Sequence, residues 1–121
     1  MLLLTSSSDA LHLVQSPVVQ LDAQASFLDH DGTTPVPGRK NTPISAAEDD
    51  VVTGPAGQAK RSVKNVHIRN ADLSLSTTVT LLHTDGGTAA ELRKVTLGPG
   101  ETLAYVESRG FFVLTSDGQE R

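Results

Sequence analysis

Few residues in this chain have side chains that could support chemistry, and the best candidate is the triplet Asp29-His30-Asp31. Together with Asp22, it could offer the clustered oxygens that a hard cation needs. Alternate residues of a strand point to opposite sides, so neighbouring ligands would have to lie in a turn, and no D-x-D-x-D-G loop is present. The spacing favours a solvated acidic turn, and we expect no metal and no other cofactor.

The other histidines and the serines lack a catalytic arrangement. His12 and His67 each stand between two apolar residues, which places them on the polar face of a strand, and His83 precedes an expected hairpin turn. The Gly-x-Ser-x-Gly motif of serine hydrolases is absent, and the serine clusters lie in polar, turn-like stretches. We therefore interpret these residues as structural.

Three glutamates, Glu91, Glu101 and Glu107, have the right side chain for glycoside hydrolysis, but that reaction needs two carboxylates facing each other across a cleft. Glu101 lies in a turn, where a solvated charge is common. Gly98-Pro99-Gly100 has the glycines of a phosphate loop, but the helix and the Lys-Ser/Thr pair of a P-loop do not follow it. We expect no catalytic residue, no cofactor-binding residue and no enzyme activity.

The composition indicates a single domain, residues 1–121, with a thin aliphatic core. The chain has 121 residues, no cysteine, no tryptophan, three phenylalanines and one tyrosine. The lack of cysteine excludes disulfides, thiolate metal sites and iron–sulfur clusters. A ligand pocket walled by aromatic rings is not expected, and neither is a small-molecule ligand.

Charge argues against a nucleic-acid partner. Ten Lys+Arg and 14 Asp+Glu give a formal net charge of −4, whereas a domain that binds phosphates normally shows a basic face. Lys60, Arg61, Lys64 and Arg69 do cluster, but Lys64 and Arg69 fall within an expected strand. The apolar run 2–4 lacks the basic region and the apolar stretch of about 7–15 residues that mark a signal peptide. No segment approaches the ~20 apolar residues of a membrane span, so we expect no contact with a membrane.

The elements that must position these residues are strands. Apolar residues alternate with polar ones over 19–27, and a shorter apolar run over 10–15 is separated from this strand by Pro17. Further strands with turns between them follow over 62–116, with a bulge expected between Leu92 and Val95, and we interpret this part as a β-meander. No window has helical spacing. The pattern predicts an all-β fold, either an antiparallel β-sandwich or a jelly-roll-like barrel.

The stretch 29–61 differs from the rest because prolines and glycines punctuate it. It is interpreted either as a meandering surface loop with one or two edge strands or as an extended arm that packs on a neighbouring subunit. Two adjacent phenylalanines, Phe111 and Phe112, must face opposite ways on a strand. One ring should therefore enter the core, and the other should be covered by the N-terminal segment or lie in an interface. The candidate interface residues are Pro35, Pro37, Arg39, Ile44, Val51, Val52, Phe111 and Phe112.

Several segments resemble one family. These are residues 63–70 (VKNVHIRN), 78–80 (TVT), 83–86 (HTDG) and 94–106 (KVTLGPGETLAYV), with 1–5 and 34–42 (TPVPGRKNT) in the N-terminal half. They resemble small β-sandwich virion accessory proteins of tailed bacteriophages and prophages, and the resemblance spans most of the chain. It implies a non-enzymatic structural component of the virion that binds itself and other virion proteins as a homo-oligomer. Capsid decoration or cement, neck or collar, and tail positions all stay open.

A second interpretation is a receptor- or carbohydrate-binding β-sandwich module of a phage tail. Sugar sites usually combine exposed aromatic rings with polar groups. In this chain only Tyr105 and one of Phe111 or Phe112 could supply such a ring, so this interpretation ranks second.

Overall fold

The computed structural model describes residues 2–121. All regular secondary structure in this range is β-strand. A six-stranded sheet has the order β10-β9-β6-β3-β4, and β1 also pairs with β6. Its strands are β1 (Leu2–Leu4), β3 (Leu21–His30), β4 (Val36–Ile44), β6 (Lys60–Asn70), β9 (Thr102–Val106) and β10 (Gly110–Leu114). A four-stranded sheet has the order β5-β2-β7-β8 and contains β2 (Ala10–Ser16), β5 (Glu48–Thr53), β7 (Thr77–Asp85) and β8 (Thr88–Leu97).

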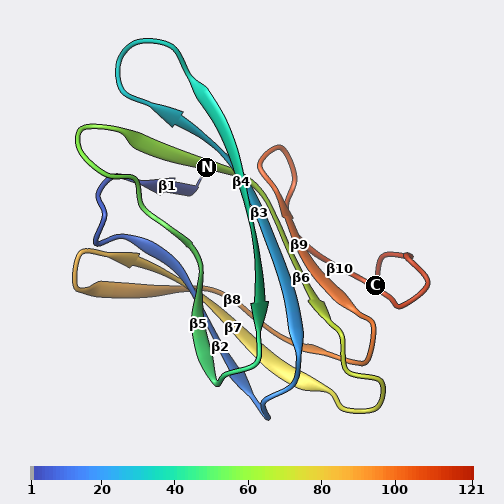
Figure 1. The fold of residues 1–121 in the computed structure, drawn as a ribbon. Helices are drawn as coiled ribbons and strands as arrows, with labels where there is room; N and C mark the ends of the chain where they lie inside the picture. The colour runs from blue at the N-terminus through green and yellow to red at the C-terminus, as the bar shows by residue number, and fades with distance from the viewer. Residues whose placement is uncertain (1) are drawn as a thin grey trace.

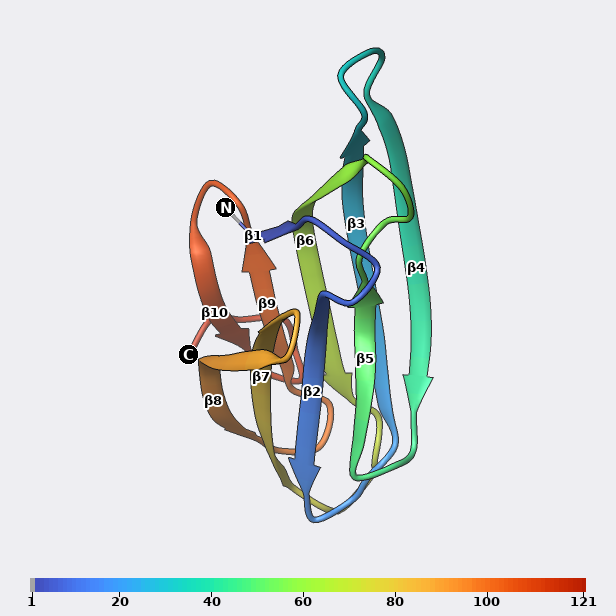
Figure 2. The same cartoon turned by 90° about the vertical axis from the view of Figure 1, so that its left-hand side faces the viewer.

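The two antiparallel sheets pack face to face, which confirms the predicted β-sandwich (Figures 1 and 2). Alternation selects the core: Leu21, Ala23 and Ala25 of β3 are buried, while Asp22 and Gln24 between them are exposed. The core is mainly aliphatic and draws on both sheets, with Leu11, Leu13, Val79, Leu81 and Leu97 from one and Leu21, Ile44, Val66, Ile68 and Leu103 from the other. No helix in the described chain is long and apolar enough to cross a membrane.

The simple meander expected over 62–116 is wrong, because the chain changes sheet twice in this part. β6 lies in the six-stranded sheet, β7 and β8 form a hairpin in the other, and β9 and β10 form a hairpin back in the first. The link 71–76 is long enough to cross the roughly 10 Å between packed sheets. The expected bulge is present: Arg93 pairs with Leu81 and Glu91 with Leu82, so Leu92 is the extra residue.

The stretch 29–61 contains two regular strands, each at the edge of its sheet: β4 pairs only with β3, and β5 only with β2. Two prolines lie inside β4, at positions 37 and 43. Successive residues of a strand point their N–H and C=O groups to opposite sides, so both proline nitrogens face the same side. A proline cannot donate to a ladder, so that side is the free edge. The prolines that indicate a loop in the sequence are therefore compatible with an edge strand.

Candidate interaction surfaces

For three residues, the prediction that they contact a partner is wrong. Ile44, Val51 and Val52 are at most 1% exposed and belong to the core of the chain itself. Ile44 ends β4, and a bulge in β5 makes Val51 an extra residue beside Val52, so all three side chains close the core along the side where these two edge strands lie. In the sequence, apolar residues of a proline-rich stretch have no visible packing partner. The strands with which they form a sheet are β2 and β3, which stand earlier in the chain.

The two phenylalanines face opposite ways, as expected. The Phe111 ring packs on the core with its centroid 5.0 Å from that of Tyr105. Phe112 lies on the outer face, and the Arg109 guanidinium covers its ring at 4.1 Å from the centroid. Arg109 is itself paired with Glu120. The cover of the outer ring is therefore a local arginine rather than the N-terminal segment.

The remaining predicted interface residues, Pro35, Pro37 and Arg39, are exposed on the β3–β4 hairpin. We define the arm as residues 30–37 of this hairpin. All of them are exposed, including Val36 at 60%, and the arm projects beyond the rest of the sandwich (Figure 2). The arm is therefore free to meet a partner.

The root of the arm is fixed by Arg61. Its Nε and Nη2 donate to the two carboxylate oxygens of Asp29 at 2.8 and 3.0 Å, and its Nη1 donates to the carbonyl of Thr53 at 2.8 Å. The guanidinium also stacks 3.9 Å from the centroid of the Phe27 ring, which lies across the cross-strand neighbour Gly38. These contacts join β3, β4, β5 and β6, so the arm leaves the body from a braced base.

The free edge of β4 is protected against pairing with another strand. On that edge only Arg39 and Asn41 keep a backbone N–H, because Pro37 and Pro43 occupy the flanking positions. Lys40 is opposite Ala25, on the core-facing side of β4, yet it is exposed. Prolines and inward-pointing lysines on an edge both oppose the addition of a strand.

A shallow hollow of about 340 Å³ lies on the outer face of the six-stranded sheet. Register brings its polar side chains together, since Gln24 of β3 is paired with both Asn41 of β4 and His67 of β6. Asp22 lies one row away, opposite Arg69. Within residues 2–121, the side chains of Asp22, Gln24, Asn41 and His67 form no hydrogen bond or ion pair. Their polar groups are available to solvent or to a ligand.

The residues considered for a metal are separated. Asp22 and Asp29 lie near opposite ends of β3, about 23 Å apart at the usual rise per residue. Asp29 is occupied by Arg61. No group of three metal-ligating side chains occurs in residues 2–121. Two of the other histidines have structural partners: His12 Nδ1 lies 2.7 Å from Asp50 Oδ1, and His83 Nε2 lies 3.0 Å from the carbonyl oxygen of Leu3.

The basic residues of β6 likewise do not form one patch. Arg61 is paired with Asp29, and Lys64 with Glu107 at 2.8 Å. Arg69 lies near the other end of the strand.

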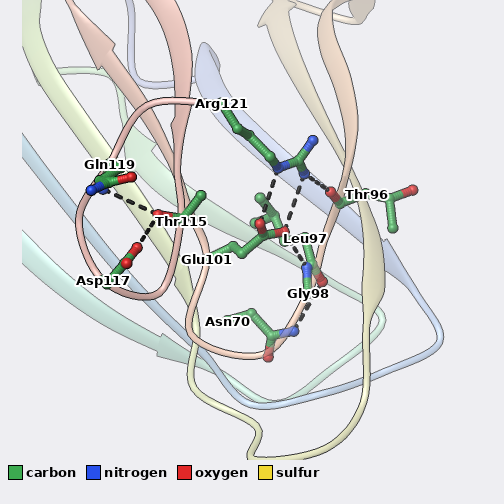
Figure 3. A network of polar contacts seen from close by, with 9 residues as sticks. All are labelled: Asn70, Thr96, Leu97, Gly98, Glu101, Thr115, Asp117, Gln119 and Arg121. Carbon is green, nitrogen blue, oxygen red and sulfur yellow. Dashed lines mark hydrogen bonds and ion pairs between the residues drawn. The ribbon is translucent and has the colours of Figure 1, made fainter.

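Glu101 is not the freely solvated turn residue that the sequence indicates. Its Oε1 accepts the N–H of Gly98 at 2.7 Å, and its Oε2 accepts from Nε of Arg121 at 3.0 Å (Figure 3). The Gly98 N–H and, after it, Arg121 lower the pKa of Glu101. The N–H of Gly100 is also used, by the carbonyl of Asn70 at 2.8 Å. The amides of Gly98-Pro99-Gly100 therefore serve the fold.

A second structural carboxylate, Asp9, was missed in the sequence, where it looks like the end of a polar serine run. It is 3% exposed and accepts hydrogen bonds from the N–H of Thr5 at 2.8 Å and the N–H of Gly86 at 3.0 Å. The hydroxyls of Thr5 and Ser6 donate to it as well. These donors, the Thr5 N–H foremost, lower the pKa of Asp9 to about 2. Asp9 thus ties the β1–β2 link to the β7–β8 hairpin.

The arm and the hollow are two surfaces that these internal contacts leave open. Comparison of the chain with protein-family models, with curated proteins and with solved structures gives no match.

Proposed function

We propose that this chain is a non-enzymatic structural subunit of a tailed-phage virion, a homo-oligomeric capsid decoration (cement) or neck (collar) protein. The observation that carries the proposal is the braced, fully exposed arm on a rigid two-layer body, in a chain whose segments resemble virion accessory proteins. A preformed projection binds with little loss of conformational entropy, because its base is already ordered. In the proposed role, the arm lies against a neighbouring virion protein.

The internal contacts support the same proposal. The least exposed carboxylate, Asp9, joins two loops, and Glu101 joins the β8–β9 link to Arg121. Asp29 joins β3 to β6. Each of these groups stabilises a connection between elements, which suits a subunit whose task is to keep its shape.

The test is recovery of the chain in purified particles from the host that encodes it. Asp29 and Val36 form the last cross-strand pair of the hairpin, so replacing residues 30–35 with Asn-Gly removes the tip and leaves a two-residue hairpin turn. We expect the wild-type chain in the particles by mass spectrometry, and we expect the shortened variant to fold but to be lost from them. Complete particles without the wild-type chain would overturn the proposal, and equal retention of the shortened variant would overturn the role of the arm.

A second candidate function, a carbohydrate- or receptor-binding module of a phage tail, is favoured by the hollow. Carboxylate, amide and imidazole groups on three adjacent strands suit a ligand rich in hydroxyl groups. A glycan array tests it, with Asp22→Ala and Gln24→Ala as matched variants. Binding that both variants abolish would support this candidate, whereas an array without signal would exclude a saccharide ligand.

A further inference from the structure

The outer edge of β8 is an unpaired strand edge. β8 is the last strand of the four-stranded sheet, and its ten residues, Thr88–Leu97, pair only with β7 (Figure 2). The strand contains no proline, and within residues 2–121 no backbone-to-backbone hydrogen bond other than those to β7 involves it. An edge strand with a row of free N–H and C=O groups is a template for another strand.

Three other strand edges are less open than that of β8. The free edge of β4 is interrupted by its two prolines. The free edge of β10 is used by the end of the chain, since the N–H of Arg121 donates to the carbonyl of Val113 at 3.0 Å and Glu120 bridges to Leu114. β5 begins with the acidic run 48–50, which would repel the same run of a second copy. β8 is therefore the edge best suited to a second copy.

The bulge at Leu92 places two opposite charges on one face of β8. Lys94 is paired with Thr80, whose side chain lies on the outer face of β7. Glu91 is paired with Leu82, on the same outer face. Without the extra residue, positions 91 and 94 would lie on opposite faces. Both side chains are exposed, and within residues 2–121 neither forms a hydrogen bond or ion pair.

The backbone groups of these two residues face the free edge. The carbonyl of Thr96 accepts from Nη2 of Arg121, so the polar groups of Thr96 point away from β7. Backbone direction and side-chain face alternate with the same period of two. Lys94 and, beyond the bulge, Glu91 therefore present their N–H and C=O groups to the same side as Thr96. The Arg121 contact limits the open part of this edge to residues 88–95.

We propose that the outer edge of β8 is the surface by which two copies of this chain bind each other, as antiparallel strands around a two-fold axis. With the axis between Leu92 and Arg93, Glu91 of one copy is directly opposite Lys94 of the other. The symmetry forms this ion pair twice, and both residues offer backbone groups to the shared ladder. The inference deepens the homo-oligomeric part of the proposed function and rests on it for its biological setting.

The bulge also selects this register. A two-fold pairing places residues at equal distances from the axis opposite each other, and their side chains must share a face. Glu91 and Lys94 share the outer face, whereas Ala90 and Val95 share the core face. Moving the axis by half a residue would place Glu91 opposite Arg93, whose side chain is on the core face. The charges and the pleat therefore agree on one arrangement.

The test is sedimentation equilibrium of the full chain between about 1 and 300 µM, a range that covers weak dimers. We expect the wild type to dimerise. Glu91→Lys and Lys94→Glu each place like charges opposite each other twice, so we expect each to raise the Kd at least about tenfold. Lys60→Glu is the matched control, an exposed lysine on β6 with the same change of charge, and it should keep the wild-type Kd.

Mixing the two single variants tests the pairing itself. In a mixed dimer, the lysine introduced at position 91 faces the glutamate introduced at position 94, and the native Lys94 faces the native Glu91, so both ion pairs return. We expect a 1:1 mixture to dimerise at a concentration where each variant alone is monomeric. The double variant Glu91→Lys with Lys94→Glu should likewise recover the wild-type Kd. Melting followed by circular dichroism establishes that the variants fold.

Three results would overturn the proposal: a monomeric wild type over the whole range, an unchanged Kd for both single variants, or a 1:1 mixture that stays monomeric. These results are separable from failure of the proposed function. A monomeric wild type that is still recovered in particles would reject the β8 contact alone. A β8 dimer absent from particles would reject the virion role alone.

Discussion

Gly54 lies so close to the carbonyl oxygen of Ser6 that a Cβ on Gly54 would be 1.7 Å from that oxygen. The contact is between two backbones, and the N–H of Gly54 also donates to the carbonyl of Asp9 at 2.8 Å. The end of β5 and the β1–β2 link are therefore in direct backbone contact, with no room for a side chain. In the sequence, this glycine looks like an ordinary loop residue.

Replacement of Gly54 by alanine should be among the most damaging small changes in the chain. The methyl group meets backbone, which cannot rotate away, so β5 or the β1–β2 link must move. We expect Gly54→Ala to lower the free energy of unfolding by about 3 kcal/mol in denaturant titrations followed by circular dichroism. Gly87→Ala is the matched control, because a Cβ there meets nothing within 4 Å. Equal stability of the two variants would contradict the prediction.

Asp9 should make the stability depend on pH in the acid range. Its pKa in the folded chain is about 2, below the ordinary value of 3.8, so the folded state binds fewer protons than the unfolded state. The stabilisation is fully present above the unfolded-state value and is lost as the pH falls towards 2. We expect Asp9→Asn to cost about 2 kcal/mol at pH 7 and much less at pH 2, measured by urea unfolding across this range.

The control for Asp9 is Asp22→Asn, on the exposed face of β3. The Asp22 carboxylate forms no hydrogen bond within the described residues 2–121, so this variant should be as stable as the wild type at pH 7. If Asp9→Asn were as stable as the wild type at pH 7, the tie to Gly86 would contribute nothing.

Asn70→Ala should destabilise the chain and loosen the loop that carries Leu73. The change leaves the carbonyls of Leu75 and Leu97 and the N–H of Asp72 without their partner. We expect a loss of about 3 kcal/mol and faster amide exchange in 71–76 by NMR. The exposed Asn41→Ala should change stability by no more than about 0.5 kcal/mol. Unaltered exchange in this loop would show that Asn70 does not brace it.

Arg61→Lys keeps the charge but loses the planar fork that binds Asp29, the carbonyl of Thr53 and the face of Phe27 at the same time. We expect a loss of about 1–2 kcal/mol in thermal unfolding, accompanied by greater mobility of the arm. Arg93→Lys on the exposed part of β8 is the control and should leave the midpoint unchanged. If Arg61→Lys were as stable as the wild type, the ion pair with Asp29 alone would account for the contribution of Arg61, and the prediction would be wrong.

Alternation was sufficient to predict the sandwich, because a half-buried strand such as β3 repeats its apolar residues with the period of the pleat. Over 29–61 it left two interpretations open, because exposed edges leave few buried residues and prolines imitate a loop; the edge strands of the first interpretation are present as β4 and β5. It failed for the path of the chain after β6, because a turn signal does not say whether the next strand stays in the same sheet.

The polar contacts could not be predicted from local sequence. Asp9 meets Gly86, and Asn70 meets Leu97, across gaps of 77 and 27 residues that only the finished fold brings together. Spacing rules detect motifs whose partners are near in sequence, so they identified Glu101 as a turn residue but not its bond to Arg121. Of the predicted interface, Pro35, Pro37 and Arg39 are exposed and remain available to a partner.

The protected edge of β4 matters most where many copies are crowded together. Strands with open ladders polymerise into fibrils at high local concentration, because each new copy exposes a fresh template. Pro37 and Pro43 remove hydrogen-bond donors from the free edge of β4, and Lys40 places a charge beside it. Another strand therefore cannot readily add to the sheet at this edge. Copies can therefore be packed densely on a shared surface and still remain discrete units.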